Sequence, residues 1–150
     1  MTRAQCIVHR HGKLLMVRHR FEAQEWWCLP GGGVKHGEDV AAAALRELKE
    51  ECCVDGTLVR LLSHYIDDQD VAIITFLVEI GGQQPCLGTD PEFSPGEQIV
   101  QELRWMPLDE ICERDRAFLW AAGLLCLDVF FEELTSWGDE ISYPSRKSKV

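Results

Sequence analysis

Three glutamates at helical spacing are the residues of this chain with the clearest chemistry. Glu47, Glu50 and Glu51 stand at positions i, i+3 and i+4, which a helix places on one face. Like charges at this spacing repel each other and destabilise a helix by about 0.2–0.5 kcal/mol per pair. A bound divalent cation would remove that repulsion, and carboxylate oxygens suit Mg²⁺ or Mn²⁺. Taken alone, such a pattern is more often a solvated helix face.

The residues upstream of these glutamates favour a metal site over a solvated face. Arg46 precedes Glu50 by four residues, so its guanidinium can pair with that carboxylate and hold its orientation. Before the helix, a run of three glycines (31–33) lets backbone carbonyls and amides approach a charged ligand closely. Glu38 stands at the expected start of the helix, where the helix dipole favours negative charge.

The segment from Gly32 to Val54 resembles the signature of the Nudix family. That signature is a glycine, five residues, a glutamate, seven residues, and then Arg-Glu-U-x-Glu-Glu-x-Gly-U, where U is a bulky aliphatic residue. Cys53 stands where the signature has its second glycine. The preceding Trp-Cys-Leu-Pro-Gly-Gly (27–32) and residues 103–110 also resemble family segments, and the likeness spans roughly residues 3 to 131. The matching positions are Gly32, Glu38, Arg46, Glu47, Leu48, Glu50, Glu51 and Val54.

The resemblance implies an α+β protein with the Nudix fold, in which a mixed β-sheet is sandwiched between α-helices. It implies hydrolysis of a nucleoside diphosphate linked to another group, with Mg²⁺ or Mn²⁺ as cofactor. Glu50 and Glu51 would be the chief metal ligands and Glu47 a further ligand or an orienting group. The Gly31 carbonyl would be a backbone ligand, and Arg46 would clamp the carboxylates.

The general base is less sharply defined. In the family it is a glutamate of the signature or one on a later loop. Glu97, on a turn before the strand that contains Trp105, stands about where a loop glutamate would reach the metal. Glu92 and Glu102 are competitors, and the alternative is that Glu97 is an ordinary solvated residue.

We expect Gly32, Gly33 and Trp27 to contact the substrate. An indole face can stack on a base or ribose. For Trp26 and Trp27 the alternative is packing in the core or in a loop. The histidines at 19, 36 and 64 are expected to be ordinary core or surface residues.

The sequence leaves the function open among three possibilities: two classes of substrate for a hydrolase, and a non-catalytic module. Hydrolases of ADP-ribose or nucleotide sugars often have an additional N-terminal strand region for dimerisation, which this sequence lacks. A nucleoside or deoxynucleoside triphosphate, or an oxidised nucleotide, is therefore favoured over ADP-ribose or a nucleotide sugar. The rival from another class is a non-catalytic module that binds a nucleotide, but such modules usually lose a metal glutamate.

Composition indicates one soluble, cytoplasmic domain. The net charge of −10 repels long nucleic acids, so a small nucleotide is the expected partner. The seven cysteines, an odd number without a Cys-x-x-Cys pair, indicate reduced thiols rather than a disulfide framework or zinc site. No segment is long and apolar enough for a membrane span. We expect a monomer or homodimer, with the domain over residues 1–135 and a polar, frayed tail over residues 136–150.

The apolar pattern predicts the order β-β-α-β-β-β-α. The first two strands should form a hairpin around His11-Gly12, and residues 21–27 should be a loop that leads into a short strand. A long glycine-rich and proline-rich loop is expected over 81–96. The full set of expected elements is strands over 3–9, 13–18, 57–65, 71–80 and 99–106, and helices over 38–52, 108–113 and 115–134.

Cys53 departs from the signature at the end of the acidic helix. A glycine there closes the helix in a left-handed conformation without strain. A cysteine in that conformation costs about 1 kcal/mol; otherwise the helix must end differently, with Gly56 making the turn. Either way we expect an altered exit from the helix with less rigidity, and not a loss of activity.

Overall fold

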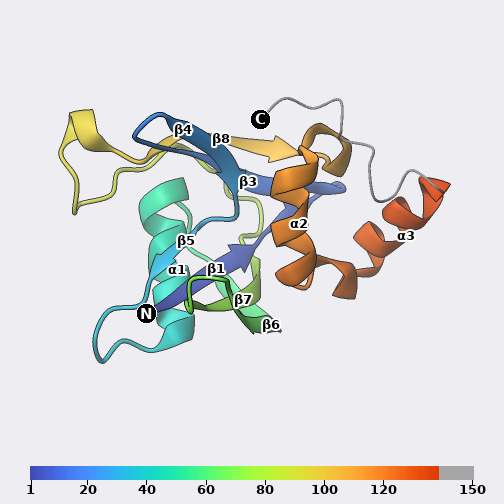
Figure 1. Ribbon diagram of the computed structural model, residues 1–150, viewed down its shortest axis with the longest axis horizontal. Coiled ribbons are helices and arrows are strands. Elements are labelled where there is room, and N and C mark those ends of the chain that lie inside the picture. Colours follow the sequence, from blue (N-terminus) through green and yellow to red (C-terminus); the bar gives the residue numbers. More distant parts are fainter. Residues whose placement is uncertain (139–150) are drawn as a thin grey trace.

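The computed structural model describes residues 1–138 of the chain, and eight strands and three α-helices form its framework (Figure 1). In chain order the main elements are β1 (Thr2–Ile7), β2 (His9–Arg10), β3 (Lys13–Phe21), β4 (Gln24–Cys28), β5 (Gly31–Gly33), α1 (Val40–Cys52), β6 (Thr57–Ile66), β7 (Ala72–Glu79), β8 (Val100–Met106), α2 (Glu113–Ala121) and α3 (Asp128–Ser136). Short 3₁₀ turns lie at Pro95–Glu97, Leu108–Glu110 and Leu124–Cys126. The α+β class expected from the sequence is confirmed.

The strands divide between two four-stranded sheets. The first has the order β5-β1-β7-β6, with β1 parallel to β7 and antiparallel to β5. In the second, β3 pairs with β2, β4 and β8. Figure 1 shows α1 on one side of the strands and α2 and α3 on the other. The mixed sheet between helices is thus built as two sheets.

The predicted N-terminal hairpin is only partly correct. His11 and Gly12 both have positive φ, as a two-residue hairpin turn requires, and the turn joins β2 to β3. The residues before the turn do not form one strand, however. Up to Ile7 they belong to β1, which pairs with β5 and β7 in the other sheet.

Two other predicted elements are wrong. Residues 21–27 are not a loop, because Phe21 pairs with Gln24 and a tight turn joins β3 to β4. The helix predicted over 115–134 is broken into α2, a 3₁₀ turn and α3. Gly123 causes this break, since its φ of 86° is incompatible with a continuous right-handed helix.

Two hydrophobic clusters hold the sheets against the helices. On one side, Ala44, Leu48 and Cys52 of α1 pack against Leu15 and Val17 of β3. The other cluster joins alternate residues of the same strand to α2 and α3; its members include Leu14, Met16, Leu119, Leu124 and Phe130. Because strand residues alternate between faces, β3 is covered on both. The core thereby fixes α1 rigidly against the strands.

No helix within residues 1–138 is long and apolar enough to cross a membrane. Residues 139–150, most of the predicted C-terminal tail, lie outside the described residues, while Ser136 still belongs to α3.

Candidate active site

Helix α1 starts with a capped end that leaves Glu38 free for another role. Asp39 is the N-cap, and its Oδ2 accepts a hydrogen bond from the Ala42 N–H at 3.0 Å. The helix therefore begins at Val40, two residues later than predicted. Glu38 lies outside the helix, and its Oε2 accepts a hydrogen bond from the Lys35 N–H at 2.9 Å.

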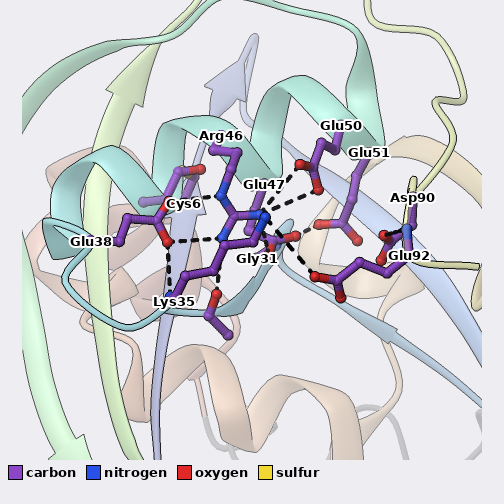
Figure 2. A network of polar contacts seen from close by, with 12 residues as sticks. Cys6, Gly31, Lys35, Glu38, Arg46, Glu47, Glu50, Glu51, Asp90 and Glu92 are labelled. Atoms are coloured by element: carbon purple, nitrogen blue, oxygen red, sulfur yellow. Dashed lines mark hydrogen bonds and ion pairs between the residues drawn. The ribbon is translucent and has the colours of Figure 1, made fainter.

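Arg46 lies at the centre of a network that orients two of the three glutamates (Figure 2). Its Nε donates to Glu38 Oε1 at 2.7 Å, and its Nη2 donates to the Gly33 carbonyl at 3.0 Å. Nη1 donates to Glu47 Oε1 at 2.9 Å and to Glu50 Oε2 at 3.3 Å. The predicted pairing of Arg46 with Glu50 is confirmed. One guanidinium thus fixes the helix carboxylates relative to strand β5.

Glu38 completes the support of Arg46. Hydrogen bonds from Arg46 and from the Lys35 N–H lower the pKa of Glu38 to about 2. The Glu38 carboxylate therefore stays charged, and its charge in turn raises the pKa of Arg46. The pair remains ionic over the whole physiological pH range.

Glu51 is the most deeply buried of the three glutamates, with only 5% of its surface exposed. Its Oε1 accepts a hydrogen bond from the Gly31 N–H at 2.7 Å. Its Oε2 lies 3.3 Å from Nε2 of His19, a buried residue of β3. Both oxygens are therefore held by parts of the chain outside the helix.

Glu47 lies against the glycine strand. A Cβ added at Gly32 would overlap the Glu47 carboxylate, whereas one added at Gly33 would meet nothing within 4 Å. Burial and the neighbouring Glu51 charge raise the pKa of Glu47 to about 7, against the opposing effect of Arg46. The carboxylates of Glu47, Glu50 and Glu51, which we call the acidic face, thus hold more negative charge than Arg46 compensates.

The NUDIX domain family model matches residues 2–127, which include every part of this site. The chain belongs to the Nudix family. One curated relative is the CMP-5'-(N-acetyl-N-hydroxy-3-aminopropyl)phosphonate hydrolase of Streptomyces rubellomurinus, 36% identical over 111 residues; the match covers 67% of this chain and 47% of the relative. Phosphatase NudJ of Escherichia coli K12 is 26% identical over 125 residues, with 81% and 78% covered. The chain thus spans only about half of the first relative.

Solved Nudix structures share the fold. A NUDIX hydrolase from Nitrosomonas europaea superposes with a TM-score of 0.64 at 17% identity, covering 88% of each chain. An ADP-ribose pyrophosphatase from Streptococcus suis gives a TM-score of 0.58 at 18% identity, covering 73% of this chain and 75% of the other. The predicted Nudix fold is confirmed.

The residues of the Nudix signature suit a divalent cation by their chemistry. Nudix hydrolases generally use such cations, and the acidic face offers carboxylate oxygens only. Burial, and after it the charge of Glu51, raises the pKa of Glu47, and a bound cation would favour the charged form of this carboxyl group. Within residues 1–138, no three His, Cys, Asp or Glu side chains already converge closely enough to form a metal site. The ligand roles of Gly31, Glu47, Glu50 and Glu51 therefore stay predictions.

The structure does not bring Glu97 into this network. Glu97 is exposed on the 3₁₀ turn Pro95–Glu97, and it lines a cleft of about 350 Å³ with Arg20, Phe21 and Phe93. Glu92 has one contact with a residue next to the network: its carboxylate is 4.0 Å from Nζ of Lys35, whose backbone N–H binds Glu38 (Figure 2).

Glu102, the other competitor, pairs with Arg18 at 3.4 Å and with Arg104 at 2.9 Å on β8. Arg18 lies on β3 and Arg104 on β8, and neither belongs to the network of Arg46. Glu102 is therefore held outside that network. Among the three loop or strand candidates, the contacts therefore favour Glu92.

The two tryptophans of β4 point to opposite faces of their sheet. Trp27 packs against the cluster of α2 and α3, and Arg104 lies over its ring at 5.1 Å. Trp26 instead meets His19 edge-on, with ring centroids 5.6 Å apart. Trp26, and not the predicted Trp27, therefore lies on the side of the acidic face.

His19 is the site residue that sequence reasoning missed. It stands 32 positions before Glu51 and belongs to no recognisable motif. The only available signal was alternation along β3, which places His19 on the same face as Val17, a core residue packed against α1.

Cys53 adopts the left-handed conformation, with φ 59° and ψ 29°, and its N–H donates to the Lys49 carbonyl at 3.0 Å. The first of the two alternatives for the end of the helix is therefore correct. Gly56 has no positive φ; a Cβ there would instead overlap Val78, so tight packing explains this glycine.

Proposed function

We propose that this Nudix protein hydrolyses the phosphoanhydride bond of a nucleoside diphosphate linked to another group, with Mg²⁺ or Mn²⁺ as cofactor. The observation that carries the proposal is the fixed geometry of the acidic face. Arg46 holds Glu47 and Glu50, while the Gly31 N–H and His19 hold Glu51. Such order at buried carboxylates is expected where they must receive a ligand in one geometry.

Glu50 and Glu51 would be the principal holders of the cation, with Glu47 and the Gly31 carbonyl beside them. When bound, the cation would neutralise phosphate oxygens and lower the pKa of a water molecule. The protein's own part is to fix these oxygens and to shield them from bulk water. Arg46 supplies the first function through three of its nitrogens, and burial of the acidic face supplies the second.

A loop glutamate would take the proton from the attacking water. We assign this role to Glu92, with Glu97 as the competitor, because Glu92 stands beside Lys35 at the edge of the network. The side chain of Glu92 is 66% exposed. It is therefore free to swing toward a bound phosphate, which many general bases do only once substrate is present.

Two similar proteins indicate which substrates to test. The Streptomyces relative acts on CMP linked to a phosphonate, and one structural neighbour, the NUDIX domain of Shewanella oneidensis NrtR, was crystallised with ADP ribose. A panel should therefore contain nucleoside triphosphates, an oxidised nucleotide, ADP-ribose, a nucleotide sugar and a CMP-phosphonate. Trp26 is the residue that we expect to contact the nucleoside.

The test is turnover of this panel with Mg²⁺ or Mn²⁺, in water enriched in ¹⁸O, with product masses read by mass spectrometry. We expect one class to be cleaved between two phosphorus atoms, with the label in a phosphate or phosphonate product. Glu51→Gln, purified in parallel, controls for contaminating phosphatases. If no compound turns over although one still binds, the alternative of a non-catalytic nucleotide-binding module replaces this proposal.

A further inference from the structure

The end of helix α1 and the loop between β7 and β8 bring two exposed cysteines together. Cys53, in its left-handed conformation, is the residue that closes α1. Cys86 belongs to the segment of residues 80–99, which we call the 80–99 loop. Both thiols are exposed, whereas Cys6, Cys52 and Cys112 are buried.

Backbone hydrogen bonds hold the loop directly on the last turn of the helix. The Cys86 N–H donates to the Cys52 carbonyl at 3.0 Å, and the Gly88 N–H donates to the Glu51 carbonyl at 2.9 Å. A Cβ added at Gly88 would overlap the backbone of Glu50, so only glycine fits this approach. The carbonyl that Cys86 binds is bonded to the nitrogen of Cys53. The two cysteines are thus one hydrogen bond apart along the backbone, the close approach that a disulfide needs.

The side chains meet as the backbones do. The thiols of Cys53 and Cys86 lie close enough to interact with each other. The third exposed cysteine, Cys126, lies elsewhere, on the 3₁₀ turn before α3, where its carbonyl accepts a hydrogen bond from Arg60.

We propose that Cys53 and Cys86 are a dithiol that hydrogen peroxide oxidises to a disulfide, which fastens the 80–99 loop to the end of α1. The Cys86 thiol first gives its proton to the solvent, and the thiolate attacks one oxygen of the peroxide. An S–O bond forms, the O–O bond breaks, and the second oxygen leaves as hydroxide, which takes up a proton from the solvent to become water. The sulfur of Cys53 then loses its proton and attacks the sulfur of Cys86. An S–S bond forms and the S–O bond breaks, releasing a second water. Two thiols thereby give two electrons to one peroxide.

The disulfide would preserve the native arrangement, because it joins segments that are already hydrogen bonded. It would close the chain between residues 53 and 86 and so restrict the unfolded state. Oxidation should therefore make the protein more stable without changing its fold. The site depends on the departure of this chain from the Nudix signature, which has a glycine at the position of Cys53.

The test compares the reduced protein with the protein treated with a slight excess of hydrogen peroxide. Mass spectrometry of the intact chain should show the loss of two hydrogen atoms, and peptide mapping should show Cys53 joined to Cys86 within one chain. Dithiothreitol should reverse both. The oxidised protein should melt several degrees above the reduced protein.

Three variants separate this site from general thiol oxidation. Cys53→Ser and Cys86→Ser should lose the cross-link and the rise in melting temperature, whereas Cys126→Ser should keep both. Mapping that shows oxygen added to separate cysteines, or cross-links between chains, would overturn the proposal. A Cys53–Cys86 cross-link in a chain with an unchanged melting temperature would overturn the proposed fastening of the loop.

Discussion

The acidic face of α1 and the 80–99 loop both present glutamates to the same region, but the protein holds them very differently. Glu51 is 5% exposed and has hydrogen-bond partners at both oxygens. Glu92 has a side chain that is 66% exposed and a single distant contact with Lys35. The helix carboxylates are built to hold one geometry, whereas the loop carboxylate is built to move.

The backbone of the 80–99 loop is nevertheless held by hydrogen bonds at two places. Gln98 Nε2 donates to the carbonyls of Asp90 and Phe93 at 3.0 and 2.7 Å, and Gly88 is bound to the end of α1. The Glu92 N–H also donates to Asp90 Oδ1 at 2.9 Å, so the backbone on both sides of Glu92 is held and movement is left to its exposed side chain. In the proposed mechanism, the charges needed before substrate arrives are thus fixed by packing, and the charge needed afterwards is left on an exposed side chain of a tethered loop.

The largest effect on kcat is expected from removing a carboxylate that the protein holds in place. Glu51→Gln keeps the shape of the side chain but removes a charge that would hold the proposed cation. We expect kcat to fall by at least about 1,000-fold, roughly 4 kcal/mol of barrier. Steady-state kinetics on the substrate found in the panel measure this effect. A fall of less than about tenfold would show that Glu51 is only a structural partner of Gly31 and His19.

The second prediction compares the two loop glutamates. Glu92→Gln should lower kcat by about 100-fold, the lower range for loss of a general base, while Glu97→Gln should change it by less than about threefold. Both residues are exposed loop glutamates, so each variant controls for the other. If Glu97→Gln has the larger effect, the assignment from the sequence is correct and the one from the contacts fails.

The third prediction concerns the guanidinium that holds the acidic face. Arg46→Lys retains the positive charge, but an ammonium group cannot reach Glu38, Glu47 and Gly33 at once. We expect kcat to fall by about 10-fold to 100-fold, as for other residues that orient metal ligands, with weaker binding of Mn²⁺. A lysine variant with normal kinetics would show that charge alone, without the fork of hydrogen bonds, supports the site.

A matched pair of glycine variants in β5 tests whether the position of the Glu47 carboxylate matters for kcat. Gly32→Ala should displace the Glu47 carboxylate and lower kcat by about tenfold, roughly 1.4 kcal/mol. Gly33→Ala adds the same methyl group one residue later, where there is open space, and should leave kcat within about threefold. Equal losses in the two variants would mean that flexibility of β5, and not the position of Glu47, limits the reaction.

The smallest effect is on stability and depends on pH. The pKa of Glu38 is lowered from 4.5 to about 2, so Glu38 contributes stability that is fully present above pH 4.5 and is lost as the pH falls toward 2. At pH 7, Glu38→Gln should melt below the wild type. Melting curves from pH 7 to pH 3 should show this difference shrinking in acid. If the difference in melting temperature stays the same from pH 7 to pH 3, the shape of the Glu38 side chain and not its charge causes the effect.

Sequence reasoning was most successful where the site is local. The pairing of Arg46 with Glu50 follows from their spacing on one helix, and the structure confirms it. The helix itself follows from its apolar face and from Asp39, although Glu38 was expected to mark its start. These features depend on residues within about two helical turns, where spacing fixes contact.

The features that sequence reasoning missed depend on pairings between distant segments. The β3–β4 hairpin turns at Glu22, which adopts a φ of 57° without the glycine or asparagine that usually marks such a turn. Without this hairpin, the sequence does not show that Trp26 faces His19 while Trp27 faces the opposite cluster. The contact of His19 with Glu51 likewise depends on how β3 packs over α1. The break between α2 and α3, by contrast, had a signal in the sequence, namely the glycine at position 123.

Calorimetric titration of the purified protein with Mg²⁺ or Mn²⁺, in the presence of a nucleotide that it binds, tests the central claim most directly. The wild type should take up the cation, and Glu51→Gln should bind it at least about tenfold more weakly, while Glu97→Gln binds it normally. If the wild type shows no cation uptake, or Glu51→Gln binds the cation as well as the wild type does, the acidic face is not a cation site and the proposed hydrolase mechanism is wrong.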